Sequence, residues 1–312
     1  MPEKLGQCAY NVIGYDGSFQ AYIGEKKSVC RFCGKRIPEA RFRKKAHALS
    51  ESIGNKYIIN NEECDNCNEY FSKIEEDFYR RHAAILSIYN IKGKKGFRII
   101  KTESIDIFDQ SGIVTIEPHN KESVSIRHDS NGIGTLDFSL ELKYHPHTPQ
   151  NVYKCLVKYA LSIVESQYMI KLSNAVTWIK NDSWHIKQLP NVIFYYTKFH
   201  SHPRVAIFIR NEENTKFPFA FSIVEFANIG YCFMIPFGND EPITGYMQHT
   251  LIGAFLQFSN GAPYYLIDLS NTKKVINRTN FSIGNLDNTT AITLPHPVTN
   301  EAIDELKNKG LI

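Results

Sequence analysis

The sequence lacks the long apolar runs and the one-sided charge that would mark a membrane protein or a highly charged, unfolded chain. No apolar run in its 312 residues approaches the length of about 20 that a bilayer-spanning helix needs. Residues 1–17 contain acids and no apolar core of the signal-peptide type. We therefore expect a cytoplasmic protein with no membrane partner. The apolar fraction of 43% and the charged fraction of 22% exclude disorder and fibrous structure.

The net charge is small, but the charges are unevenly placed. The formal charge is +4, yet residues 1–100 hold 18 Lys/Arg and 12 Asp/Glu, whereas the rest holds 18 and 20. A patch of this kind suits a polyanion because each neutralised phosphate releases counterions, although basic runs are also common on solvated faces. The excess peaks where a single acid, Glu39, faces seven bases: Arg31, Lys35, Arg36, Arg41, Arg43, Lys44 and Lys45.

The sequence has no paired set of cysteines suited to a disulfide framework. Seven cysteines are an odd number, and three of them, Cys8, Cys155 and Cys232, are scattered. The other four form two Cys-x-x-Cys pairs, Cys30–Cys33 and Cys64–Cys67, separated by 30 residues. This spacing predicts a tetrahedral structural zinc site in a treble-clef arrangement of knuckle, hairpin and helix, because four thiolates leave no position open. Two unrelated reduced pairs are the alternative.

Hydrophobic periodicity predicts an α+β protein with two domains, 1–95 and 96–312. Apolar residues at helical spacing predict one helix over Asp65–Tyr89, and the glycines and lysines of residues 92–96 mark the boundary. A long amphipathic helix is expected over Val152–Ile179 and a short one near 301–309. A β-rich segment, 96–147, could form a separate part before 148–312. Strands are predicted at 97–100, 105–108, 113–116, 124–126, 136–142, 192–196, 205–209, 219–226, 231–235 and 264–267.

Three short motifs lie in a fixed order between and after the cysteine pairs. They are Ala46-His47, the loop Ser50…Gly54-Asn55, and the ending Cys64-Asp65-Asn66-Cys67-Asn68. Over residues 28–80 the sequence resembles the HNH endonuclease family, and most closely those members whose motif is framed by two Cys-x-x-Cys pairs. The resemblance implies an N-terminal ββα-metal domain, in which a two-stranded hairpin packs on a helix around one divalent cation.

The resemblance also implies roles for individual residues. His47 matches the general base that takes a proton from the attacking water, and an imidazole suits this task because it titrates near neutral pH. Asn61 matches the residue that orients this histidine, and the adjacent Asn60 is an alternative. Asn68 matches the metal ligand at the helix start, and its amide oxygen suits Mg²⁺ or Mn²⁺. A structural histidine is the alternative for His47.

One position departs from the family pattern. Many family members carry a metal-binding acid directly before the catalytic histidine, whereas this sequence has Ala46. A second protein ligand for the catalytic ion is therefore needed. Glu75 and Ser72 are candidates, since Glu75 lies about two helical turns from Asn68. An ordinary solvated helix acid is the alternative interpretation of Glu75.

These observations predict a metal-dependent endonuclease that cuts DNA, with RNA as an alternative substrate. Arg41, Arg43, Lys44 and Lys45 would bind phosphates next to the scissile bond. Residues 96–312 carry no recognisable motif and are expected to recognise, regulate or assemble, a layout shared with bacterial defence nucleases. A homo-oligomer, or an activating ligand or partner acting through this region, stays open. The rival hypothesis is a non-catalytic treble-clef module that binds nucleic acid or protein.

Overall fold

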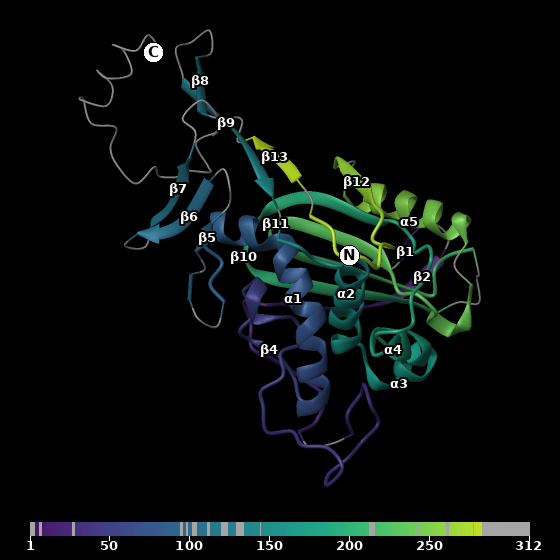
Figure 1. Ribbon diagram of the computed structural model, residues 1–312. Helices are drawn as coiled ribbons and strands as arrows, with labels where there is room; N and C mark the ends of the chain where they lie inside the picture. Colours follow the sequence, from purple (N-terminus) through teal and green to yellow (C-terminus); the bar gives the residue numbers. More distant parts are fainter. Residues whose placement is uncertain are drawn as a thin grey trace. The chain divides into compact units, whose positions relative to one another are not determined.

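The computed structural model contains both helices and strands, which confirms the predicted α+β class (Figure 1). Its contacts define two compact units, one of Met1–Arg81 with Pro146–Val275 and one of His82–His145 with Ile276–Ile312. No helix in the described part of the chain has the length and apolar character needed to cross a bilayer. The structure describes residues 4–5, 8–26, 29–93, 96–97, 99–101, 105–110, 113–119, 124–128, 134–143, 145–211, 216–242, 244–259, 262–276 and 278–282.

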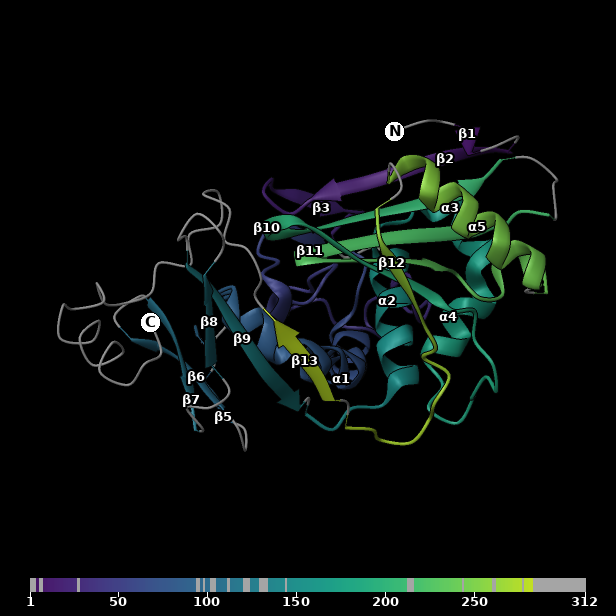
Figure 2. The same ribbon diagram turned by 90° about the horizontal axis from the view of Figure 1, so that it is seen from above.

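The first unit is built on an antiparallel sheet with the strand order β1-β2-β10-β11, to which β12 adds by pairing with β10 (Figure 2). Two predicted strands, 192–196 and 205–209, are halves of one long strand, β10. Its register against β11 shifts between Tyr196 and Arg204, so bulges join the two halves. The runs at 219–226 and 231–235 likewise belong to one strand, β11. The strands span Lys4–Leu5 (β1), Cys8–Asp16 (β2), Val192–Arg210 (β10), Ala220–Met234 (β11) and Tyr264–Ile267 (β12).

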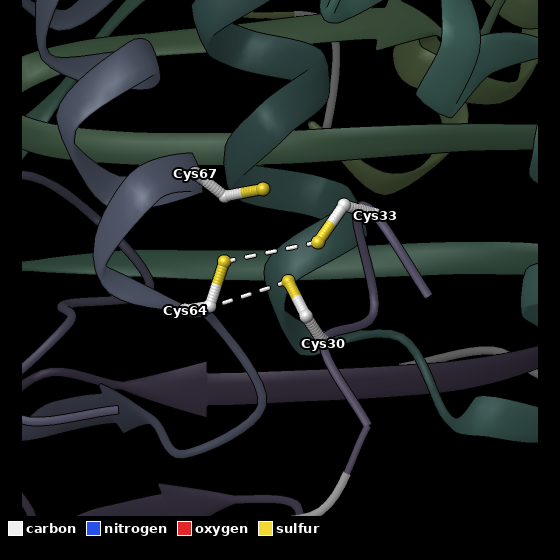
Figure 3. Close-up of side chains that lie close together, drawn as sticks. All are labelled: Cys30, Cys33, Cys64 and Cys67. Carbon is white, nitrogen blue, oxygen red and sulfur yellow. Dashed lines mark hydrogen bonds between the residues drawn. The ribbon is translucent and has the colours of Figure 1, made fainter. Parts of the chain in front are cut away.

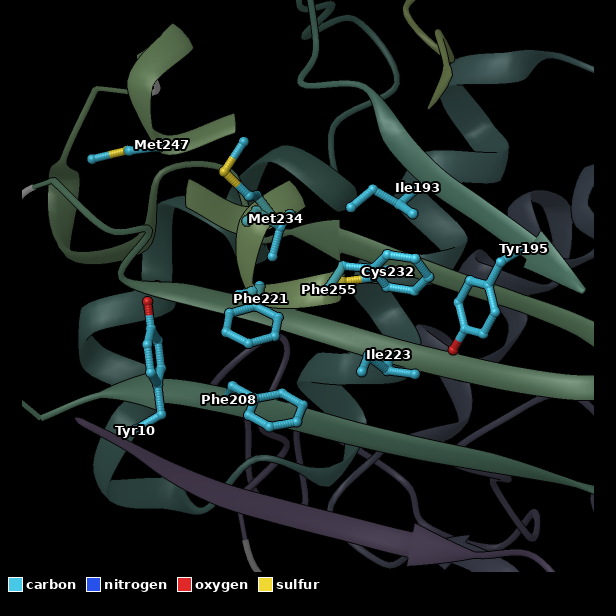
Figure 4. Close-up of a cluster of buried hydrophobic side chains, with 12 residues drawn as sticks. Tyr10, Ile193, Tyr195, Phe208, Phe221, Ile223, Cys232, Met234, Met247 and Phe255 are labelled. Atoms are coloured by element: carbon cyan, nitrogen blue, oxygen red, sulfur yellow. The ribbon is translucent and has the colours of Figure 1, made fainter. Parts of the chain in front are cut away.

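Helix α5, Gly245–Phe258, covers one face of this sheet. Alternate strand residues such as Phe208 and Phe221 point to this face, and their rings stack at 4.4 Å (Figure 4). Phe255 of α5 packs on Tyr195 at 4.9 Å between ring centroids. The helix was not predicted, because its apolar residues stand among strand-like runs in the sequence.

Helix α2, Pro149–Ile163, packs on the other face together with α1, Asp65–Ile88. Tyr153 of α2 donates a hydrogen bond to the Met234 carbonyl at 2.8 Å. Phe78 of α1 contacts Tyr159 of α2 at 5.4 Å and Phe226 of β11 at 5.5 Å, measured between ring centroids. The prediction of α1 over Asp65–Tyr89 is confirmed to within one residue.

The single helix predicted over Val152–Ile179 is wrong. Helix α2 ends at Ile163, and Val164 is extended, with φ −67° and ψ 145°. The guanidinium of Arg31 donates to the carbonyls of Leu161, Ser162 and Val164 at 2.9, 2.9 and 3.0 Å. A distant arginine thus satisfies carbonyls that a continuing helix would have bonded itself. The chain continues through α3 (Ser166–Met169), η3 (Ile170–Leu172) and α4 (Ser173–Ile179).

The second unit contains two small antiparallel sheets, with strand orders β5-β6-β7 and β13-β9-β8. Strands were predicted at each of the positions of β5 to β9. The helix predicted near 301–309 lies outside the described residues. The strands span Ile100–Lys101 (β5), Ile105–Gln110 (β6), Ile113–Pro118 (β7), Val124–His128 (β8), Gly134–Lys143 (β9) and Arg278–Ser282 (β13).

The compact units divide the chain differently from the predicted boundary between residues 95 and 96. Residues 1–81 group with residues 146–275. The N-terminal module, which contains the pairs Cys30–Cys33 and Cys64–Cys67, therefore belongs to the same unit as α2 and the large sheet. Helix α1 ends at Ile88, and the division between the two units falls within it, after Arg81. The physical reason is burial: the inner face of α1 covers α2 and β11 instead of forming a core of its own.

A buried lysine links α2 to this module. Lys158 is fully buried, and its ammonium lies 3.0 Å from Glu75 Oε1, 3.5 Å from Glu63 Oε2 and 3.0 Å from the His47 carbonyl oxygen. Burial alone would lower the pKa of Lys158, but the two carboxylates outweigh it and hold this pKa above the usual value. Lys158 is therefore charged at neutral pH.

We expect Lys158→Met to lower the free energy of unfolding by about 3–5 kcal/mol, since it leaves buried carboxylate charge without its partner. Urea denaturation followed by tryptophan fluorescence measures this loss. Lys154→Met is the matched control: Lys154 lies one turn earlier on α2, is also buried, and donates to the single carbonyl of Asn181 at 2.6 Å. Equal losses for the two variants would contradict an electrostatic role for Lys158.

Candidate active site and zinc centre

The four paired cysteines converge on one point (Figure 3). Their sulfur atoms all lie within 4.8 Å of one another. Cys30 and Cys33 sit in a tight turn, closed by hydrogen bonds from Gly34 N to Cys30 O at 2.7 Å and from Cys30 N to Lys35 O at 2.9 Å. Gly34 has φ +71°, a conformation that glycine adopts without strain. Cys64 precedes α1, and Cys67 lies in its first turn.

The donor set fits zinc. Tetrahedral Zn–S bonds of about 2.3 Å place sulfur atoms about 3.8 Å apart, and Cys33 Sγ and Cys64 Sγ are 3.7 Å apart. A hydrogen bond from Cys67 lowers the pKa of Cys30 to about 4, whereas burial raises that of Cys64 to about 11. Four thiolates this close repel one another unless a cation neutralises them. The cluster can therefore bind zinc, and a full thiolate set makes that zinc structural.

A short antiparallel hairpin carries His47. Ala48 N donates to Ile58 O at 3.0 Å, Asn60 N donates to Ala46 O at 2.9 Å, and His47 pairs with Ile59. Residues 58–60 form β4, which also pairs in parallel with β3, Ala21–Ile23. Hairpin and α1 together give the ββα order that the sequence predicted.

The loop of the hairpin is held by two polar residues. Asn55 is fully buried; its amide donates to the carbonyls of Leu49 and Ile58 at 2.7 and 3.0 Å, and its oxygen accepts from Ile58 N at 3.0 Å. Ser50 caps the short 3-10 helix η1, Glu51–Ile53, by accepting from Ser52 N at 3.2 Å. These residues of the sequence motif therefore shape the loop that follows His47.

The His47 side chain is mostly enclosed but still reaches solvent, with 12% of its surface exposed. Its Nε2 lies 3.5 Å from Glu51 Oε1, four residues along the chain. A carboxylate at this distance stabilises an imidazolium. Sequence reasoning missed Glu51, although its spacing from His47 was visible in the sequence.

Lys158 also holds the backbone of His47, through the hydrogen bond to its carbonyl oxygen. This lysine lies 111 residues from His47 in the sequence, so no local signal identified it. Its partner Glu63 is fully buried, and burial raises the pKa of Glu63 to about 7 although the Lys158 ammonium opposes this. The backbone of the candidate site is thus held by a buried cluster of charges, formed by Lys158, Glu63 and Glu75.

The predicted asparagines lie in different surroundings. Asn61 donates its side-chain amide to the Gly24 carbonyl at 3.2 Å. Asn60 is buried and donates its amide to Glu63 Oε2 at 3.4 Å. Asn68 is half-buried in the first turn of α1, directly after Cys67. Asn60 and Asn61 therefore tie the end of β4 to its neighbours.

The predicted second metal ligand has an unexpected neighbour. Glu75 Oε1 accepts from the Lys158 ammonium at 3.0 Å, and Glu75 lies about 10.5 Å along the helix axis from Asn68. The other candidate, Ser72, is exposed and donates to the Glu69 carbonyl at 2.6 Å. Among the described residues, the four cysteines are the only group of three or more His, Cys, Asp or Glu placed to share an ion. The Glu75 carboxylate is thus bound to an ammonium, about two helical turns from Asn68.

The four predicted phosphate-binding residues are exposed: Arg41, Arg43, Lys44 and Lys45. Asp65, the first residue of α1, fixes their backbone. Its carboxylate accepts from Arg43 N at 3.0 Å and Lys44 N at 2.9 Å, and its own amide donates to Arg41 O at 2.8 Å. The basic segment is therefore attached to the same helix start that carries Cys67 and Asn68.

We expect the purified protein to hold one zinc ion per chain, and Cys67→Ser to lose it with a fall in melting temperature, because structural zinc binding contributes directly to folding. Mass spectrometry of metal content and thermal unfolding measure the two effects. Cys232→Ala is the control, since Cys232 is buried outside the cluster. Full zinc content in Cys67→Ser would exclude a four-cysteine site.

Comparison with known proteins agrees with this geometry. Residues 30–83 match the model of a family described as HNH endonuclease. No curated protein and no solved structure gives a significant match. The match begins at Cys30 and includes the hairpin, both cysteine pairs and most of α1. Residues 30–83 are therefore similar to the HNH endonuclease family.

Proposed function

We propose that this protein is an endonuclease that hydrolyses phosphodiester bonds of DNA, with His47 as its general base. The observation that carries the proposal is the position of His47: it lies on the hairpin of an HNH-family ββα module, beside Glu51 and next to an exposed basic segment. Because nucleases act on nucleic acid, the basic side chains of residues 41–45 are proposed to bind the phosphate groups of the substrate backbone.

The proposed chemistry begins with a water molecule held next to the His47 imidazole. The imidazole takes a proton from this water as its oxygen attacks the phosphorus, and the bond to the leaving oxygen breaks. Glu51 stabilises the imidazolium that forms. The hydrogen bond from Lys158 to the His47 carbonyl keeps the strand in place, and Arg43, Lys44 and Lys45 hold the flanking phosphates.

A divalent ion such as Mg²⁺ or Mn²⁺ would stabilise the negative charge on the phosphate and on the leaving oxygen. Asn68 is the residue proposed to bind it, as the family resemblance implies. Glu75 is a poor second ligand, since the Lys158 ammonium already occupies one of its oxygens and would repel a cation. Glu75 is therefore proposed to belong to the Lys158 cluster and not to the metal site.

The wider role of the chain is also a proposal. Because the family match ends at residue 83, residues 96–312 are proposed to recognise or regulate, as in bacterial defence nucleases whose activity awaits a ligand or partner. One observation favours the rival, a non-catalytic binding module: Ala46 stands where many family members have an acid. A cleavage assay separates the two functions.

We expect His47→Ala to reduce cleavage of supercoiled plasmid DNA by at least about 100-fold, because the attacking water loses its base. The assay compares Mg²⁺, Mn²⁺ and a chelator, and an RNA substrate runs in parallel. Zinc content and melting temperature should stay unchanged, since the imidazole is not a zinc ligand. His249→Ala, an exposed histidine on α5, is the control. Cleavage by His47→Ala at the rate of the unaltered protein would refute the assignment.

We expect Glu51→Gln to lower kcat about tenfold with little change in KM, because the carboxylate acts on the imidazolium and not on bound DNA. Steady-state cleavage of a labelled oligonucleotide separates the two constants. Glu39→Gln removes an exposed acid from the basic segment and serves as the control. A rise in KM alone would instead place Glu51 in substrate binding.

A further inference from the structure

A pocket of about 380 Å³ opens beside the hairpin that carries His47. Its walls come from three segments of the N-terminal module: β3 with the turn after it, residues 42–46, and the end of β4. Hydrogen bonds join these walls, since Asn61 N donates to Ile23 O at 2.9 Å and Asn60 N donates to Ala46 O at 2.9 Å. The pocket is therefore part of the folded framework.

Two aromatic side chains line the pocket. Tyr22, on β3, has 60% of its surface exposed. Phe42 is half-buried and lies on the opposite segment, just before the basic residues. The exposed Tyr22 ring does not gain the stabilisation that burial gives an aromatic side chain. It offers a flat surface for a planar ligand. Aromatic rings in such positions stack with the bases of unpaired nucleic acid.

Four cationic side chains surround the same opening: Lys26, Arg43, Lys44 and Lys45. All four are exposed. Arg43 and Lys44 are held at the backbone by the Asp65 carboxylate, so their side chains start from fixed positions. Charge of this sign, next to an aromatic surface, matches a ligand that joins a flat ring to a phosphate.

The inner end of the pocket is polar. Asn60 and Glu63 line this end, and only 1% and 2% of their surfaces are exposed to solvent. The second carboxylate oxygen of Glu63, Oε1, has no hydrogen-bond partner among the residues that the structure describes. Amide and carboxylate groups are those that read the donors and acceptors at the edges of bases.

We propose that this pocket binds one unpaired nucleotide of the substrate strand next to the scissile phosphate, an inference that rests on the nuclease function proposed above. Ala46 lines the pocket and His47 is the next residue, so the pocket borders the strand that carries the proposed general base. A base within a duplex is stacked and paired and cannot enter a pocket. The site therefore selects single-stranded DNA, or a duplex that is locally opened.

The test measures binding in the His47→Ala background, so that it does not depend on catalysis. The probe is a short single-stranded DNA carrying one 2-aminopurine at each position in turn, compared with the same sequence as a duplex. Tyr22→Ala should weaken binding of the single strand about tenfold and abolish the quenching of 2-aminopurine, and should change duplex binding less than twofold. Tyr22→Phe keeps the ring and should restore both signals.

Tyr265→Ala is the matched control, because Tyr265 on β12 is also a strand tyrosine and is 58% exposed. It should leave single-strand binding unchanged. Unchanged single-strand binding in Tyr22→Ala, or an equal loss for single strand and duplex, would overturn the pocket while leaving the nuclease function standing. Undiminished cleavage by His47→Ala would overturn the catalytic assignment, and the binding result would still decide whether the pocket takes a base.

Discussion

The buried charge of Lys158 is the constraint on which the candidate site depends. An ammonium in the protein interior is tolerated only with nearby opposite charge and hydrogen-bond acceptors. Glu63 and Glu75 supply that charge, and the His47 carbonyl supplies an acceptor. These three partners come from the end of the hairpin, from α1 and from the strand that carries His47. Because Lys158 has to keep all three partners close, it fixes the relative positions of α2, α1 and the hairpin, which together build the site.

This dependence explains which features could be predicted from the sequence. Helix α1 and the zinc cluster were predictable because their signals are local: helical spacing of apolar residues, and two Cys-x-x-Cys turns. The position of His47 followed from short motifs in a fixed order. The contacts that Lys158 and Arg31 make between α2 and the module join residues 83 to 133 positions apart and leave no periodic pattern. The boundary expected between residues 95 and 96 would require that the N-terminal module has a hydrophobic core of its own.

Arg31 shows the same effect at the C-terminal end of α2. The apolar spacing alone predicted that this helix continues to Ile179. The Arg31 guanidinium instead donates to the carbonyls of two residues in the last turn of α2 and of Val164 just beyond it, and it also pairs with Glu62 at 2.7 Å. The arginine stands between the two cysteines of the first pair, Cys30 and Cys33. The turn that brings Cys30 and Cys33 into the cysteine cluster therefore also ends α2. A member of the basic run that seemed suited to phosphates is thus a structural residue with a buried side chain.

The alanine before His47 can be understood from the same charges. Ala46 is 2% exposed and lines the same pocket as Glu63, whose pKa burial already raises to about 7. An acid at position 46 would add a second carboxylate near a buried one, and two such groups cannot both ionise cheaply. Glu51, on a partly exposed loop, brings its carboxylate to 3.5 Å from the His47 imidazole. The alanine at position 46 therefore avoids a second carboxylate beside Glu63, and its small side chain leaves room in the pocket that both residues line.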